Sequence, residues 1–303
     1  MKINFLLSNL PSGLNKSALI LSLVLLFIVS IFSCGKDTME RNSENQFGYT
    51  PPDYPEKPAG RYLKSIYLND LGMGTAGTKV EFEYDEKNYV QSYLLRAFDH
   101  NDITGFVWLE YDINGNAKKI RLLTPDSTLK QYDNIEYDLE GRFTKISTYQ
   151  KSDGNENFEL SYFSEFMYPS VDTIVEYHYI RYNNFEMPHK SLFLLDSSGN
   201  VFRKMNFRFE EKYPYSEREN YFTKRQRINE HHDLPKYYLS IYGISMEMVL
   251  SSNTLTGFQS FTYEQDSIKV PLGEPSIMPF EYDEKGFPIS QDGVYFFYYT
   301  DFE

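Results

Sequence analysis

A short motif recurs in this chain and constrains its fold more than any other feature. An apolar residue followed by Glu-Tyr-Asp occurs four times, at 82–85, 109–112, 135–138 and 280–283. Random order would give on the order of 0.1 Glu-Tyr-Asp triplets, so these copies are internal repeats. A degenerate copy contains Asp196, and the successive Asp residues are 27, 26, 58 and 87 residues apart. The two long spacings are close to multiples of ~29, which leaves room for eroded copies.

Each copy predicts a β-turn. Asp is favoured at the first position of a type I turn because its carboxylate accepts backbone N–H bonds, and Gly is favoured at the fourth because φ can turn positive there. In the first copy the fourth position is Asn, which next best tolerates a left-handed backbone. The predicted turn residues are Asp85 with Asn88, Asp112 with Gly115, Asp138 with Gly141, Asp196 with Gly199, and Asp283 with Gly286.

The residues before the turns alternate at the period of a β-strand. Val80, Phe82 and Tyr84 share one face, and Glu81 and Glu83 share the other. We therefore expect the repeated Tyr on the buried face and the repeated Glu in water. Because every residue of the motif has a structural role, the motif predicts no catalytic residue.

Strand-forming residues dominate the rest of the chain. Aromatic residues make up 17% of it, and no long segment from Tyr62 onward is apolar at the helical period. These features predict an all-β fold in which residues 61–303 form a single repeat domain, an antiparallel meander of repeated hairpins. So many strands cannot stay flat, so we expect a strongly curled or barrel-like sheet.

The only cysteine, Cys34, lies where an apolar segment ends. Positive charge at Lys2 and Lys16 is followed by an apolar run at 18–32, whose helix would be ~23 Å long, shorter than the ~30 Å hydrocarbon core. We interpret 1–33 as a lipoprotein signal peptide, Cys34 as the lipidation site and the Pro-containing segment 34–60 as a flexible tether. The alternative is an uncleaved membrane anchor. A lipidated cysteine leaves no thiol for a disulfide, a metal or catalysis.

The charge of the chain excludes one class of partner. The net charge is −13, and residues 1–33 contain two of the 30 basic side chains and none of the 43 acidic ones, so the remainder carries −15. Phosphate binding needs clustered Lys and Arg, so we expect no nucleic-acid partner. The basic run at 224–227 is interpreted as a solvated strand face.

Motifs for cofactors and metals lack their structural context. The glycine pattern at 72–77 precedes a predicted strand instead of the helix that dinucleotide binding requires. The segment 243–247 lacks the last Gly of a nucleophile elbow. The His-His-Asp run at 231–233 places adjacent side chains on opposite strand faces, which opposes metal binding. We therefore expect no cofactor, no metal and no catalytic residue among these motifs.

The repeats resemble the Tyr-Asp repeats of Rhs and teneurin-type proteins, most closely at Gly141-Arg142. With the lipobox and the tether, they are also similar to a group of uncharacterised Bacteroidetes lipoproteins with a porin-like all-β fold. This resemblance implies an outer-membrane lipoprotein, periplasmic or surface-exposed, that is attached to the membrane by its N-terminal lipid. It brings no catalytic residues with it.

Two functions stay open at this point. Aromatic side chains exposed on an acidic sheet suit a non-catalytic binding module for a glycan or a surface protein partner. The alternative is an uncharacterised envelope hydrolase whose paired carboxylates, Glu81 with Glu83 or Glu210 with Glu211, converge across a cleft. An aromatic C-terminus also fits a membrane barrel, but charged side chains on several strands oppose that reading.

Overall fold

The computed structural model describes residues 49–57, 60–68, 78–97, 102–151, 156–182, 185–208, 211–222, 246, 250–264, 268–291 and 295–302. The chain divides into two compact units, Met1–Thr50 and Pro51–Glu303, and the second contains the sheet. The signal peptide, Cys34, Glu210 and the runs at 72–77, 224–227 and 231–233 lie outside the described residues, as does 243–247 except Met246. Within the described ranges, no helix has the length and hydropathy needed to cross a membrane.

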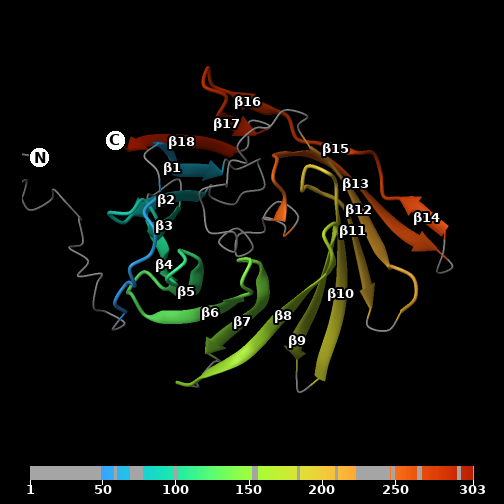
Figure 1. The fold of residues 1–303 in the computed structure, drawn as a ribbon, viewed down its shortest axis with the longest axis horizontal. Helices are drawn as coiled ribbons and strands as arrows, with labels where there is room; N and C mark the ends of the chain where they lie inside the picture. The colour runs from blue at the N-terminus through green and yellow to red at the C-terminus, as the bar shows by residue number, and fades with distance from the viewer. Residues whose placement is uncertain are drawn as a thin grey trace, which may run out of the picture. The chain divides into compact units, whose positions relative to one another are not determined.

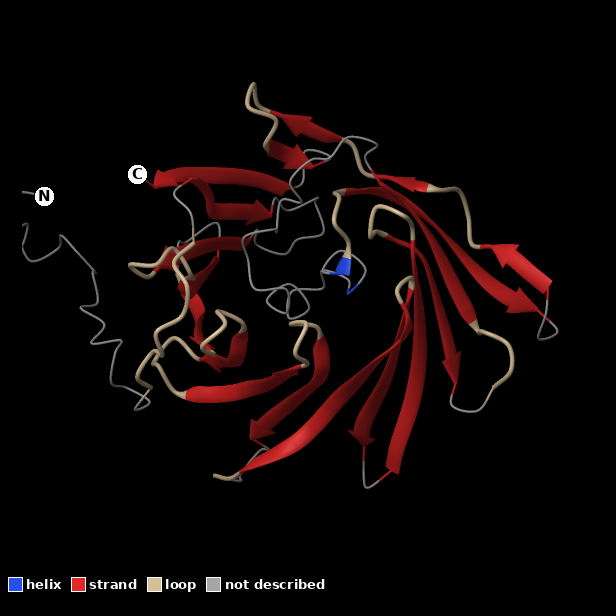
Figure 2. Ribbon diagram, in the orientation of Figure 1, coloured by secondary structure: helices blue, strands red, loops and turns tan. Residues whose placement is uncertain are grey.

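The described chain is built almost entirely from β-strands (Figure 2). This confirms the predicted all-β class. The strands are β1 (Gly60–Leu68), β2 (Thr78–Tyr84), β3 (Val90–Ala97), β4 (Ile103–Tyr111), β5 (Ala117–Leu123), β6 (Leu129–Tyr137), β7 (Phe143–Lys151), β8 (Phe158–Ser170), β9 (Thr173–Tyr182), β10 (Phe185–Leu195), β11 (Val201–Arg208), β12 (Ser216–Phe222), β13 (Leu255–Glu264), β14 (Ile268–Pro271), β15 (Ser276–Ile277), β16 (Phe280–Tyr282), β17 (Pro288–Gln291) and β18 (Tyr295–Phe302).

These strands form one antiparallel sheet in which sequence neighbours pair from β1 to β14. β13 also pairs with β15, and β16, β17 and β18 pair in turn. β18 then pairs with β1 along its whole length, so the last strand meets the first (Figure 1). The strand pairings of the described residues include none between β15 and β16. The sheet is therefore barrel-like, as the repeated hairpins predicted, and it is not closed.

The main hydrophobic core lies on one face of this sheet. Val107, Leu109 and Tyr111 of β4 are buried there with Ile120 of β5 and Ile135 of β6. We call this the inner face and the opposite one the outer face. Strand alternation places every second side chain of these strands on the outer face.

The five repeats form hairpin turns of one kind. In each, Oδ1 of the turn Asp accepts the backbone N–H of the residue four positions later, at 2.9–3.0 Å. The residue three positions after the Asp donates its N–H to the Asp carbonyl and has a left-handed backbone. Its φ is +65° at Asn88, +78° at Gly115, +73° at Gly141, +78° at Gly199 and +88° at Gly286. A similar turn that sequence analysis missed has Thr124 first and Ser127, with φ +66°, fourth.

In two copies of the motif, the tyrosine forms a hydrogen bond to the preceding hairpin. The hydroxyl of Tyr111 donates to the carbonyl of Val90 at 2.6 Å, and that of Tyr137 donates to the carbonyl of Ala117 at 2.8 Å. Each acceptor is the first residue of the strand that follows the preceding turn. The same bond recurs where the motif has eroded, from Tyr168 to Phe143, from Asn220 to Val201 and from Tyr299 to Pro288.

The glutamate of the motif faces a polar residue across the hairpin. Glu83 accepts a hydrogen bond from Ser92, and Glu281 accepts one from Ser290. Exposure in water, expected from the sequence, holds for Glu136 but is wrong for Glu110, which is only 6% exposed. The reason is that the outer face of β4 is also covered, and Glu110 is neutralised there by an ion pair with Arg121.

Candidate functional site: an aromatic strip on the outer face

The second carboxylate oxygen of each turn Asp separates the repeats into two groups. In the three middle repeats Oδ2 is occupied by the side chain four positions later, which is Asn116, Arg142 or Asn200. In the first and last repeats that position is aromatic, Tyr89 or Phe287. Oδ2 of those turns instead accepts a hydrogen bond from the N-terminal part of the compact unit.

That N-terminal part is fastened at two points. The Tyr54 hydroxyl donates to Asp85, and the Arg61 guanidinium donates to Asp283. Tyr54 lies in the segment assigned to the tether, yet it is 5% exposed and its ring lies 4.8 Å from that of Tyr89. Residues 51–57 therefore belong to the compact unit that contains the sheet.

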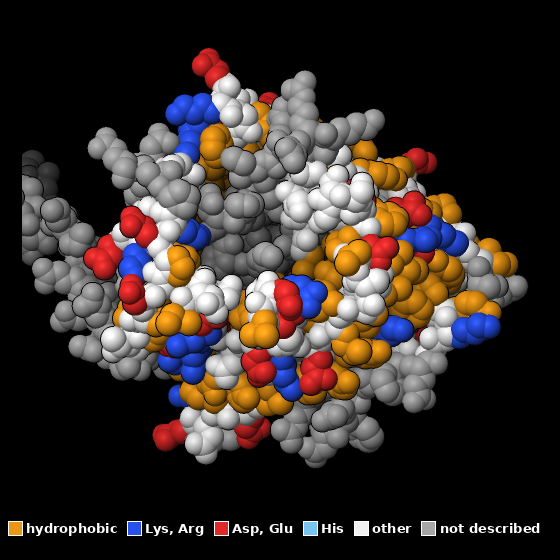
Figure 3. All heavy atoms as spheres, viewed as in Figure 1, with side chains coloured by type: hydrophobic (Ala, Val, Ile, Leu, Met, Phe, Trp, Pro, Cys, Tyr) orange, Lys and Arg blue, Asp and Glu red, His pale blue; other side chains and the backbone are white. Residues whose placement is uncertain are grey.

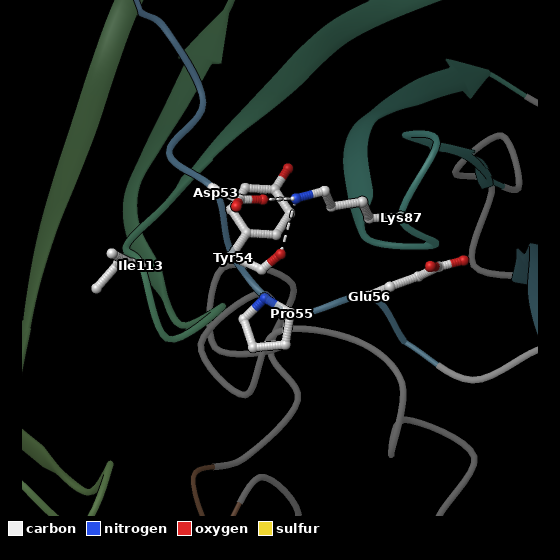
Figure 4. Close-up of a pocket in the computed structure, with 6 residues that line it drawn as sticks. All are labelled: Asp53, Tyr54, Pro55, Glu56, Lys87 and Ile113. Carbon is white, nitrogen blue, oxygen red and sulfur yellow. Dashed lines mark hydrogen bonds and ion pairs between the residues drawn. The ribbon is translucent and has the colours of Figure 1, made fainter.

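A shallow hollow of about 520 Å³ lies beside the first of these attachments (Figure 4). Lys87 Nζ donates there to Asp53 at 2.6 Å and to the Tyr54 carbonyl at 2.8 Å. Lys87 thus binds two polar groups of the N-terminal segment, and the hollow lies where that segment contacts the first turn. Its lining residues are Asp53, Tyr54, Pro55, Glu56, Lys87 and Ile113.

The carboxylate pairs proposed for a hydrolase are engaged by other groups. Glu81 forms ion pairs with Lys79 and Arg96. Burial works to raise the pKa of Glu81, but hydrogen bonds from Lys79 and Arg96 outweigh it and hold that pKa below its usual value. A general acid needs a raised pKa, so Glu81 does not suit that role. Glu211 lies 3.8 Å from Arg208.

A serine, a histidine and a glutamate meet on the inner face of β8 and β9, a cluster that sequence analysis missed. Ser164 Oγ donates to Glu176 at 2.7 Å and lies 2.8 Å from His178 Nδ1. A hydroxyl has one proton, so His178 is the donor to Ser164 in this arrangement. A nucleophilic serine requires the reverse, with the histidine as acceptor. Within the described part of the chain, no group of three His, Cys, Asp or Glu residues could hold a metal ion.

Aromatic side chains gather on the outer face of β6–β9. The rings of Tyr132 and Tyr149 stack across β6 and β7, with centroids 4.8 Å apart and planes 13° apart. The rings of Phe163 and Tyr179 stack across β8 and β9 at 4.4 Å and 11°. Phe158 lies against Tyr132 at 5.1 Å. All five side chains are half-buried, and we call them the aromatic strip.

A lysine flanks each stacked pair in the same way. Lys119 of β5 lies 4.4 Å from the centre of the Tyr132 ring, and Lys145 of β7 lies 4.6 Å from the centre of the Phe163 ring. Both lysines are seven residues after a turn Asp, so they occupy equivalent positions in consecutive repeats. Each stacked pair and its lysine therefore form a lysine–aromatic–aromatic unit, and the two units are two strands or about 10 Å apart.

The surface around the strip mixes apolar and charged groups. Along the lower edge of the view in Figure 3, where Figure 1 places β6–β8, hydrophobic side chains lie among Lys, Arg, Asp and Glu. Cation–π contacts at such exposed sites contribute about 0.5–1 kcal/mol each. The strip could have been predicted from the alternation of side chains along each strand, which places these aromatic residues on the face of the sheet opposite to the motif tyrosines.

No protein-family model matches this chain, and no curated protein is similar to it in sequence. Among solved structures, it is similar to a porin-like protein from Bacteroides vulgatus, with 10% identity and a TM-score of 0.48 over 79% of this chain and 98% of the other. A porin-like protein from Bacteroides uniformis has 13% identity and a TM-score of 0.38 over 83% and 100%. The Photorhabdus luminescens Tc holotoxin pore has 13% identity and a TM-score of 0.21 over 80% and 12%.

Proposed function

We propose that this protein is a non-catalytic cell-envelope lipoprotein whose aromatic strip binds a glycan. The observation that carries the proposal is the repetition of the lysine–aromatic–aromatic unit on the outer face of consecutive hairpins. A polysaccharide presents the same group at regular intervals, and a repeated surface unit can contact several of them at once. The partial exposure of the strip leaves ring edges and hydroxyls available for an amphipathic ligand.

The envelope location rests on the sequence at 1–34 and stays a prediction. The glycan is preferred to a surface protein partner because of the regular order of the strip. Protein interfaces centre on a buried cluster of anchors, whereas the strip is an extended and half-buried row.

Binding of full-length protein to immobilised polysaccharides tests the proposal. Tyr132→Ala and Phe163→Ala each remove one ring from one unit, and we expect each to weaken binding by about 10-fold, as expected when a ring contact worth about 1.4 kcal/mol is lost. Tyr221→Ala is the matched control, because Tyr221 is 40% exposed and lies outside the strip. Thermal unfolding of each variant separates lost binding from lost folding.

Three results would contradict the proposal. Saturable glycan binding that is equally strong in both strip variants would place the site elsewhere, and capture of an envelope protein without any glycan binding would favour a protein partner. Reproducible hydrolysis of a polysaccharide that disappears in Glu81→Gln would decide for the hydrolase alternative.

A further inference from the structure

Three lysines lie beside rings of the strip, in a chain whose net charge is −13. Lys145 is neutralised by Glu165, whose carboxylate lies 3.0 Å from Nζ. Lys119 and Lys151 form no ion pair with any described residue. An acidic protein that leaves lysines unpaired beside aromatic rings has a local charge opposite to its net charge.

The two unpaired lysines flank a single aromatic cluster. Lys119 lies over the Tyr132 ring, and Lys151 lies 5.1 Å from the centre of the Phe158 ring. The centres of the Phe158 and Tyr132 rings are 5.1 Å apart, so each of two neighbouring rings has a lysine ammonium group beside it. A ligand that covers both rings would therefore lie near both ammonium groups.

The ion pair beside Lys119 does not balance the charge of Lys119 itself. Burial lowers the pKa of Lys119, and the nearby charge of Arg121 lowers it further, while Glu110 acts in the opposite direction. Glu110 cannot compensate fully because it is engaged by Arg121 at 2.6 Å. A negative group placed near Lys119 would balance this charge.

We propose that the glycan bound by the strip is anionic, and that Lys119 and Lys151 bind its carboxylate or sulfate groups while Tyr132 and Phe158 contact its sugar rings. This inference rests on the proposed function and names the class of ligand. The charge complementarity gives specificity for acidic over neutral polymers and makes binding dependent on salt.

Polysaccharide pairs that differ only in their acid groups provide the test. Polygalacturonic acid and its methyl ester share one backbone, and binding of full-length protein to each is measured at about 0.05 M and 0.5 M salt, where screening differs strongly. We expect tighter binding of the acid form and loss of that preference at high salt. Lys119→Gln and Lys151→Gln should each weaken binding of the acid form by about 2- to 5-fold, and each should weaken binding of the acid form more than binding of the ester. Lys64→Gln, at an exposed lysine of β1, is the control.

The outcomes separate this inference from the proposed function. One outcome would overturn the anionic ligand and leave glycan binding intact. In it, the ester binds as tightly as the acid form or more tightly, and binding is weakened by Tyr132→Ala but not by Lys119→Gln. Equal losses in Lys64→Gln and Lys119→Gln would show a non-specific charge effect and would also overturn it. No binding to either form, nor to any acidic or neutral polysaccharide tested beside them, would overturn both proposals.

Discussion

The turn aspartate uses its two carboxylate oxygens for different purposes. Oδ1 holds the backbone of the turn, and this is the same in all five repeats. Oδ2 takes its partner from the residue four positions later when that residue is polar, and from the N-terminal segment when it is aromatic. One residue thus decides whether a repeat is self-contained or fastens another part of the chain.

The turn glycines differ in what surrounds them, and this difference predicts a difference in stability. A Cβ at Gly141 would lie 3.9 Å from the nearest heavy atom, Asn116 Oδ1, so Gly141→Ala adds only left-handed strain. A Cβ at Gly115 would lie 2.8 Å from Cζ of Tyr89. We expect Gly141→Ala to lower the free energy of unfolding by about 1–2 kcal/mol, and Gly115→Ala by at least about 1 kcal/mol more because Tyr89 must move.

Urea unfolding measures both changes. Glu136→Gln serves as the control, since this side chain is exposed and the change should be nearly neutral. Equal losses in the two glycine variants would show that the Tyr89 contact has no energetic role, and a loss in Glu136→Gln as large as theirs would remove the argument from turn geometry.

His178 predicts a loss of stability in mild acid. Burial lowers its pKa from 6.5, Glu176 opposes this, and the charges of His189 and Lys204 lower the pKa further. Below about pH 6.5 the unfolded chain binds a proton at this histidine more readily than the folded chain does. The free energy of unfolding therefore decreases as the pH is lowered. Unfolding in urea at pH 7.5 and 5.5 should show a smaller fall in His178→Gln than in the wild type. An unchanged fall in this variant would assign the effect to other groups.

At the scale of the element, the repeated tyrosine acts between hairpins. The motif strands β4 and β6 place the hydroxyls of Tyr111 and Tyr137 on the first carbonyl of the strand after the preceding turn, which helps to hold successive hairpins in register. The bond is retained on β8, β12 and β18, where Tyr168, Asn220 and Tyr299 supply the donor. The structural repeat therefore includes strands that lack the Glu-Tyr-Asp motif.

Removing one of these hydroxyls should weaken the sheet measurably. Tyr111 is 3% exposed, and Tyr111→Phe leaves the buried Val90 carbonyl without this donor, so we expect a loss of about 1–2 kcal/mol in the free energy of unfolding. Tyr213→Phe, at a side chain that is 40% exposed, should cost almost nothing. Equal stability of wild type and Tyr111→Phe in chemical denaturation would show that the hydroxyl bond does not stabilise the sheet.

At the scale of the whole molecule, β1 joins the two ends of the meander. It pairs with β2 on one side and with β18 on the other. The residues just before and at its start are fastened to the first and last turns by Tyr54 and Arg61. The N-terminal end of the unit that contains the sheet is therefore held where the first and last strands meet.

Membrane attachment is predicted to depend on Cys34. A Cys34→Ser variant should lose its lipid and leave the membrane fraction on washing without detergent, because the lipid is the predicted link to the membrane. Fractionation and intact-mass measurement check this. A wild-type mass that includes residues 1–33 and no acyl group would show that the lipoprotein interpretation is wrong.

The class and connectivity of the fold could be predicted from the amino-acid sequence alone. Alternation at period two and Asp followed by Gly or Asn are local properties, so they fix strands and turns without knowledge of distant partners. The meander of hairpins and the strong curl of the sheet followed from them. Three features depend on contacts between distant residues and could not be predicted: β18 pairs with β1, Glu110 is buried, and Tyr54 belongs to the compact unit.

The aromatic strip and the Ser164 cluster also required the tertiary structure. Their members come from different strands, and cross-strand register brings together residues that no spacing in the sequence relates. Some of the hydrogen bonds between hairpins persist where the Glu-Tyr-Asp motif is no longer present in the sequence, as at Asn220. A search of the sequence for the motif does not find them, for a similar reason. A donor of another residue type can reach the same carbonyl, because the sheet fixes the position of the donor and leaves its identity free.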